Sequence, residues 1–99
     1  MEEPLHPAMR ALQAVGNPPD WQVVVRWSDG DEAVVVTDTF FDSDDNDADY
    51  QCWVVNVVKP LARAPRSERR LVAGAPWEIR STDPIMEIRS LDGTRRWTP

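Results

Sequence analysis

Residues 21–39, WQVVVRWSDGDEAVVVTDT, contain the signal that decides the fold. Two valine-rich runs flank Asp29-Gly30, and Asp-Gly favours a two-residue turn, because both central residues of that turn need positive φ. Valine and tryptophan also suit a pleated, half-buried surface. The stretch therefore predicts a β-hairpin of two antiparallel strands.

The length of the turn sets which side chains of this hairpin face the core. A two-residue turn pairs Val25 with Val34, and directly paired residues share a face of the sheet. A three-residue turn would flip one strand relative to the other. With the two-residue turn, the predicted core comprises the later Trp53 and one face of the hairpin, namely Trp21, Val23, Val25, Trp27, Val34 and Val36.

A short helix is predicted before the hairpin. Pro7 can occupy its first turn, where the missing N–H has no cost, and the helix should run to about Val15. Leu5, Met9 and Leu12 fall on one helical face. We expect this face to pack on the sheet or across an open barrel end.

Strand signals resume after an acidic interruption. Residues 40–49 are predicted as a loop, because the aspartates there repel one another and favour turns. Residues 50–58 form a third strand, which Pro60 should end, since proline cannot donate to a ladder. Residues 61–76 fit a long loop or a short helix, with a possible strand at 71–73.

The C-terminal part predicts a second set of strands. Residues 77–81 and 86–90 alternate between apolar and polar positions. Residues 92–93, Asp-Gly, repeat the hairpin signal, and a two-residue turn there pairs Ile88 with Trp97. The chain would thus end almost on a strand.

These elements predict a mainly β protein. The expected fold is a small antiparallel barrel or a strongly bent sheet of five to six strands, SH3-like or OB-like, with one short N-terminal helix. An open α+β sheet is the alternative. The length fits one domain, 1–99. It would contain a helix and proline-rich lead (1–20), an acidic three-strand half (21–58) and a basic half with the second hairpin (59–99).

The charge is strongly asymmetric along the chain. Residues 1–58 hold twelve Asp or Glu against two Lys or Arg, a net charge of −10, whereas residues 59–99 hold nine Lys or Arg against five Asp or Glu, or +4. An acidic surface is a poor general nucleic-acid binder, because affinity for phosphate rests on Lys and Arg. It suits a basic protein partner instead.

Cysteine usage and hydropathy bear on the location of the protein. The single cysteine, Cys52, allows no internal disulfide and fits a reducing compartment. No apolar run approaches the ~18 residues of a membrane span, and no basic-then-apolar leader is present. We therefore expect a cytoplasmic protein that does not contact a membrane, with an oligomeric state that the sequence leaves open.

The first candidate site is the acidic segment with its aromatic neighbours. Its composition predicts a surface that docks on a basic partner, as inhibitors, immunity-type proteins and nucleic-acid mimics do. We therefore predict a non-enzymatic interaction module. The expected partner-binding residues are Phe41, Asp42, Asp44, Asp45, Asp47, Asp49 and Tyr50.

Weak calcium binding by the same segment is a third possibility. From Asp42, the residues Asp44 and Asn46 match a calcium loop, but Asp47 stands where glycine is needed and Trp53 where a bidentate Glu is needed. The sequence therefore predicts neither a tight metal site nor a cofactor.

The alternative function is nucleic-acid binding by a small barrel. Basic side chains in the 59–70 segment could contact phosphates, with Trp77 or Trp97 stacking on a base. The residues concerned are Lys59, Arg63, Arg66, Arg69 and Arg70, with Arg95 and Arg96 on the same face.

Catalytic patterns are weak in this chain. The only histidine, His6, lies in the proline-rich lead, and Cys52 lies within a predicted strand, where a thiol usually acts as a small hydrophobe. Nothing in the sequence therefore predicts an enzyme.

Overall fold

The computed structural model describes residues 6–15, 22–42 and 51–99, without the side chains of residues 41 and 42. Within these residues, one helix and six strands form: α1 (Pro7–Val15), β1 (Gln22–Trp27), β2 (Glu32–Asp42), β3 (Gln51–Ala62), β4 (Pro76–Arg80), β5 (Ile85–Ser90) and β6 (Arg96–Trp97).

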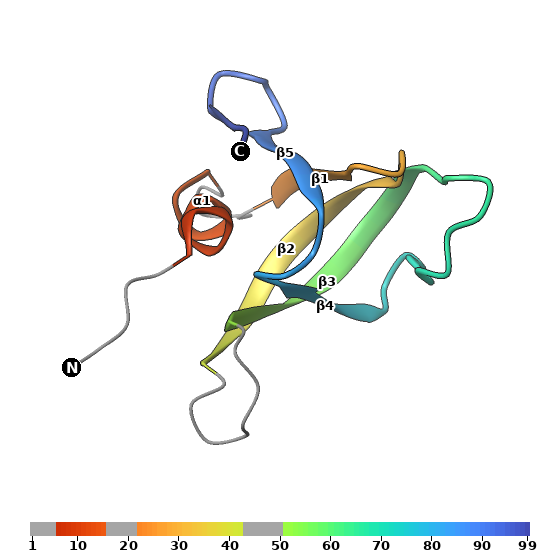
Figure 1. Cartoon of the computed structure of the whole chain (residues 1–99), viewed down its shortest axis with the longest axis horizontal. Helices are drawn as coiled ribbons and strands as arrows, with labels where there is room; N and C mark the ends of the chain where they lie inside the picture. Colours follow the sequence, from red (N-terminus) through yellow and green to blue (C-terminus); the bar gives the residue numbers. More distant parts are fainter. Residues whose placement is uncertain (1–5, 16–21, 43–50) are drawn as a thin grey trace.

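The strands form one antiparallel sheet in the order β4-β3-β2-β1-β5-β6. The sheet bends strongly, and β5 returns to lie beside β1 (Figure 1). It does not close into a barrel, because β4 and β6 remain its two edges. The mainly β prediction with a short helix is confirmed, whereas a closed barrel is not formed.

The turn of the first hairpin is one residue longer than predicted. Trp27 N–H donates to the carbonyl of Asp31 at 2.9 Å, and Gly30 N–H donates to the carbonyl of Trp27 at 3.1 Å. The loop therefore contains residues 28–30. Gly30 has a φ of 110°, which L side chains rarely adopt. Both two-residue and three-residue loops place glycine at a position with positive φ, so the glycine does not fix the length of the turn.

This longer loop corrects the predicted register. Val25 pairs with Ala33 rather than with Val34. Ala33 and Val35 are fully buried in the core, whereas Val36 faces the other side of the sheet and is half-buried. Val34 shares that second face, where it is also buried.

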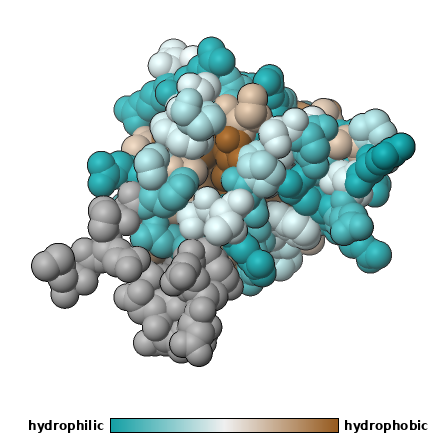
Figure 2. All heavy atoms as spheres, viewed as in Figure 1, coloured by the Kyte–Doolittle hydropathy of each residue, from teal (hydrophilic) through white to brown (hydrophobic). Residues whose placement is uncertain are grey.

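The core lies inside the bend of the sheet, under α1. Of the other residues predicted for it, Val23, Val25 and Trp27 are buried, Trp53 is partly buried, and Trp21 lies outside the described residues. On the face shown in Figure 2, hydrophobic residues gather in a small central area that hydrophilic residues surround.

The pairing of β2 with β3 extends beyond both predicted ends. At one end, Phe40 belongs to β2 rather than to a loop, because it pairs with Trp53 and their rings lie 5.3 Å apart. At the other end, Pro60 lies within β3. Beyond Asn56, β3 pairs with β2 alone, so a proline here can leave its missing N–H on the open side.

The helix forms where it was predicted. Met9 and Leu12 are fully buried against the sheet, and Leu5 lies outside the described residues. Trp53 Nε1 donates to the carbonyl of Met9 at 3.0 Å, and His6 N–H donates to Gln51 Oε1 at 2.7 Å. The first bond joins α1 to β3, and the second joins the residue before α1 to β3. In the part of the chain that the structure describes, no helix has the length and hydrophobicity to cross a bilayer.

The C-terminal elements mostly match the prediction. Ile88 pairs with Trp97 as expected for the second hairpin. Residues 63–75 form a long loop, and the possible strand at 71–73 does not form. This loop runs from the end of β3 to the start of β4 (Figure 1).

Candidate functional site

A buried aspartate in the first hairpin holds the 63–75 loop in place. Asp31 is 1% exposed, and its carboxylate accepts hydrogen bonds from Ala64 N–H at 2.7 Å, from the Ser67 hydroxyl and from the Arg69 guanidinium at 2.9 Å. All three donors come from the loop. We call these four residues the Asp31 cluster.

Arg69 makes further contacts on the same hairpin. Its guanidinium lies 2.6 Å from the Asp29 carboxylate and 4.9 Å from the centroid of the Trp27 ring. The ring face attracts the positive charge. Arg69, one of the predicted nucleic-acid contacts, is thus engaged within the protein.

The bonds of the Asp31 cluster lower the pKa of the Asp31 carboxyl. Burial by itself would raise this pKa, but the hydrogen bonds from Ser67, Ala64 and Arg69 and the positive charge of Arg69 outweigh it, so the pKa lies below 3.8. The carboxylate therefore stays ionised at neutral pH, as a hydrogen-bond acceptor requires.

Glu87, on β5, is also buried and paired with arginines. Burial would raise its pKa, but Arg89, 2.7 Å away, and Arg96, 2.5 Å away, hold it below the ordinary 4.5. Arg89 also contacts Glu32 at 3.3 Å. These ion pairs link β2, β5 and β6 across β1.

We expect the protein to lose stability in acid. Asp31 and Glu87 have depressed pKa values when folded, so their contribution is present above the unfolded values of 3.8 and 4.5 and is lost as pH falls through the folded values. Each group can add up to about 1.4 kcal/mol per pH unit to the slope. Urea unfolding measured between neutral pH and pH 2 tests this. A free energy of unfolding that stays constant as the pH is lowered from 4.5 would contradict it.

The predicted basic face is divided between two roles. Arg96 pairs with Glu87, and Arg95 donates to the carbonyl of Ala14 at 3.1 Å, so both help to hold the C-terminal strand. The remaining basic side chains are exposed and form no ion pair with another described residue: Lys59, Arg63, Arg66 and Arg70.

A groove of about 620 Å³ lies between the end of β3 and the 63–75 loop. Its apolar lining comes from both segments, and Arg63, Arg69 and Arg70 supply its positive charge. Asp31 also lines the groove, and its carboxylate is already bound to Ala64, Ser67 and Arg69. The apolar lining residues are Pro60, Leu61, Ala62, Leu71 and Val72.

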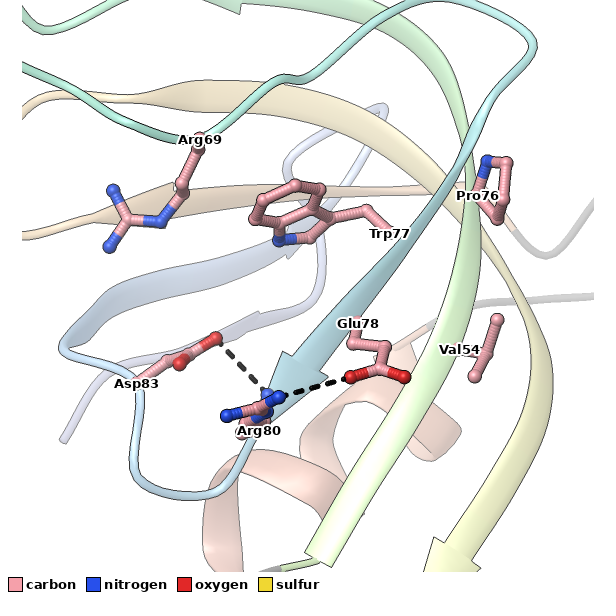
Figure 3. A pocket seen from close by; sticks show the side chains of 7 residues that line it. All are labelled: Val54, Arg69, Pro76, Trp77, Glu78, Arg80 and Asp83. Carbon is pink, nitrogen blue, oxygen red and sulfur yellow. Dashed lines mark hydrogen bonds and ion pairs between the residues drawn. The ribbon is translucent and has the colours of Figure 1, made fainter.

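A second hollow, of about 660 Å³, lies beside β4. Figure 3 shows the Trp77 ring between Arg69 and the strand. In the same view, Arg80 lies near Glu78 and Asp83. Arg80 lies 3.3 Å from the Glu78 carboxylate. The Asp83 carboxylate accepts from the backbone N–H of Arg80 at 3.1 Å, and Arg69 pairs with Asp29 and Asp31 instead. Of the described lining residues, the hollow shares only Arg69 with the groove.

The structure places few of the predicted acidic site residues. The backbone of Phe41 pairs with Cys52 and that of Asp42 with Gln51, at the end of the β2–β3 ladder. Their side chains are not described. The other predicted residues lie outside the described residues: Asp44, Asp45, Asp47, Asp49 and Tyr50.

The remaining chemically active groups have ordinary structural environments. Cys52 is buried, and burial raises the pKa of its thiol, which disfavours the nucleophilic thiolate. Among residues 6–15, 22–42 and 51–99, no group of three or more His, Cys, Asp or Glu side chains could hold a metal ion.

Asp31 and Ser67 were missed as key residues by the sequence prediction. The two-residue turn places Asp31 at the start of the second strand, opposite Ser28, and nothing local marks it as a residue that binds a distant loop. Only the approach of the 63–75 loop gives it a role.

Comparison with known proteins adds no relative from which a function could be transferred: no family model, no curated protein and no solved structure matches this chain.

Proposed function

We propose that this protein is a non-enzymatic interaction module. Its acidic half would dock on a basic surface of a macromolecular partner, as an inhibitor, immunity-type protein or nucleic-acid mimic does. The observation that supports this proposal is the distribution of charge along the β2–β3 ladder.

The two ends of this ladder differ in charge balance. At the end where Glu32 pairs with Ala62, the acidic side chains are matched by arginines: Asp29 and Asp31 by Arg69, and Glu32 by Arg89. The opposite end lies at most about 33 Å away, because the eleven residues of β2 make ten steps of about 3.3 Å each when fully extended.

The excess acid lies in the sequence from Asp38 to Asp49. Between residues 27 and 58 the chain has no Lys, Arg or His. Asp38, on β2 toward this end, is exposed and forms no ion pair with another described residue. The five aspartates of residues 42–49 follow it in sequence. Such a concentration of one sign attracts a basic surface over long range.

The proposal predicts a charge-dependent association rate. Replacing Asp44, Asp45 and Asp47 by Asn removes three charges while keeping size and polarity. The association rate for a partner recovered from native cells should fall about tenfold at low salt, and its salt dependence should flatten, because steering acts mainly on association. Surface plasmon resonance at several salt concentrations measures both.

The matched control removes three positive charges from the 63–75 loop. Replacing Arg63, Arg66 and Arg70 by Gln should leave that rate nearly unchanged. Arg69 is left intact, because its loss would disturb the Asp31 cluster. An unchanged association rate for the Asn triple variant at low salt would refute acidic docking.

Nucleic-acid binding through residues 59–70 remains the alternative function. It predicts the reverse result: the arginine variant would lose affinity for a single-stranded oligonucleotide, and the salt slope would fall by about one unit per lost phosphate contact. Two observations weigh against it. Arg69 is engaged by Asp29 and Asp31, and the predicted stacking rings of Trp77 and Trp97 pack against the core.

We also propose three further properties of this protein from its sequence. The fold type, SH3-like or OB-like, is one, and a cytoplasmic location is another. Weak calcium binding by the segment that follows Asp42 is the third, and calorimetry with calcium would measure it directly.

A further inference from the structure

The groove between β3 and the 63–75 loop combines exposed apolar side chains with positive charge. Its apolar lining is partly in contact with solvent: Leu61 is 41% exposed and Val72 is 57% exposed. Beside them, Arg63 and Arg70 are exposed and form no ion pair with another described residue. Apolar surface and unpaired positive charge thus occur together.

The walls of the groove are held in position before any partner arrives. One wall is the end of β3, paired with β2 up to Ala62. The other wall is the loop, which the Asp31 cluster binds through Ala64, Ser67 and Arg69. A preformed site loses less conformational entropy on binding, which favours affinity.

The strand that forms one wall has an open edge. Beyond Asn56, β3 pairs with β2 alone, and Leu61 falls in a register shift, where it has no partner in β2. Gly74 N–H and the Ala75 carbonyl bond to Val57, where the loop approaches β4. Past that point no other described strand pairs with this edge of β3, so an extended chain can lie beside it, held by side-chain contacts because Pro60 supplies no N–H for a ladder.

From these features we infer that the groove binds an extended peptide segment of a partner protein, one that carries carboxylates beside apolar side chains. Arg63 and Arg70 would pair with the carboxylates, and Leu61 and Val72 would contact the apolar side chains. A volume of about 620 Å³ lies in the usual range for ligand sites. The groove does not include the acidic residues of the proposed docking surface, so this inference does not depend on that proposal.

The chemistry of the groove favours a peptide over a single-stranded nucleic acid. Nucleic-acid sites of this size rely on aromatic rings on which bases stack. None of the described residues that line the groove is aromatic. Its central guanidinium, that of Arg69, is already bound to Asp29 and Asp31.

A labelled peptide in which aspartate and leucine alternate is the probe for this inference. Fluorescence anisotropy should show saturable binding that weakens as salt is added, because the ion pairs are screened. The R63Q/R70Q variant should bind about tenfold more weakly, since each lost guanidinium removes charge-assisted hydrogen bonds. Leu61→Ser should also weaken binding, which a purely electrostatic contact would not show.

Arg66→Gln supplies the matched control, because Arg66 is exposed and does not line the groove. It should bind the peptide as the unaltered protein does. Circular dichroism checks that each variant is folded. Amide chemical shifts in a titration should change along residues 58–63 and 69–72.

Four results would overturn the inference. The first is an absence of saturable peptide binding, and the second is an equal loss of affinity in Arg66→Gln. Tighter binding of oligothymidine than of the peptide, lost in R63Q/R70Q, would show that the groove takes nucleic acid. Self-association of the free protein that R63Q/R70Q abolishes would identify a second copy as the occupant. Each readout is independent of the acidic-docking experiment.

Discussion

Replacing Asp31 by Asn is expected to lower the free energy of unfolding by about 2–4 kcal/mol, because it breaks a buried ion pair from one side. The Asn amide can still accept from Ala64 N–H, but its NH₂ group would face the Arg69 guanidinium, donor against donor. The Ser67 hydroxyl would lose its carboxylate acceptor.

The same substitution should loosen the 63–75 loop. Urea unfolding measures the free energy, and hydrogen exchange at the Ala64 amide reports the loop directly, because this amide donates to Asp31. We expect the exchange of this amide to accelerate more than that of the amides in β1. The slope of stability against pH below 4 should also become shallower, since one depressed pKa is removed.

Asp29→Asn is the control for this prediction. Asp29 also pairs with Arg69, at 2.6 Å, but its side chain is 40% exposed. An exposed ion pair contributes about 0–1 kcal/mol, and Asn keeps the oxygen that accepts from Asp31 N–H. Equal destabilisation by the two substitutions would show that burial of Asp31 is not what stabilises the loop.

The second large effect concerns the register of the first hairpin. Val35→Ala should cost about 2–3 kcal/mol, because it removes two buried methyl groups and leaves a cavity. Val35 is fully buried in the core opposite Val23. Val36→Ala should cost less than about 1 kcal/mol, since Val36 is half-buried on the other face.

This pair of valines distinguishes the two possible turns. A two-residue turn would put Val36 in the core and Val35 on the other face, and so would reverse the order of the two costs. Chemical denaturation of both variants in one buffer decides between the turns. A larger loss for Val36→Ala than for Val35→Ala would contradict the three-residue loop.

Much of the local structure could be predicted from the sequence. The helix from Pro7 to Val15 and the pairing of Ile88 with Trp97 form as expected, and the first hairpin forms with another register. Each depends on signals within a few residues, such as a proline at a helix start or Asp-Gly between strands. For the predicted basic contacts, the sequence did not reveal that Arg69 pairs with Asp29 and Asp31 within the protein.

The sequence by itself determined where the chain turns, which segments favour strands and how the charge divides between its halves. Only the tertiary structure decided the register around Gly30, the continuation of β3 through Pro60 and the role of Asp31. The partners of Asp31 in the loop lie 33, 36 and 38 residues away along the chain. Local φ preferences and periodicity carry no information about such partners, because the desolvation and pairing of a carboxylate depend on what the fold brings to it.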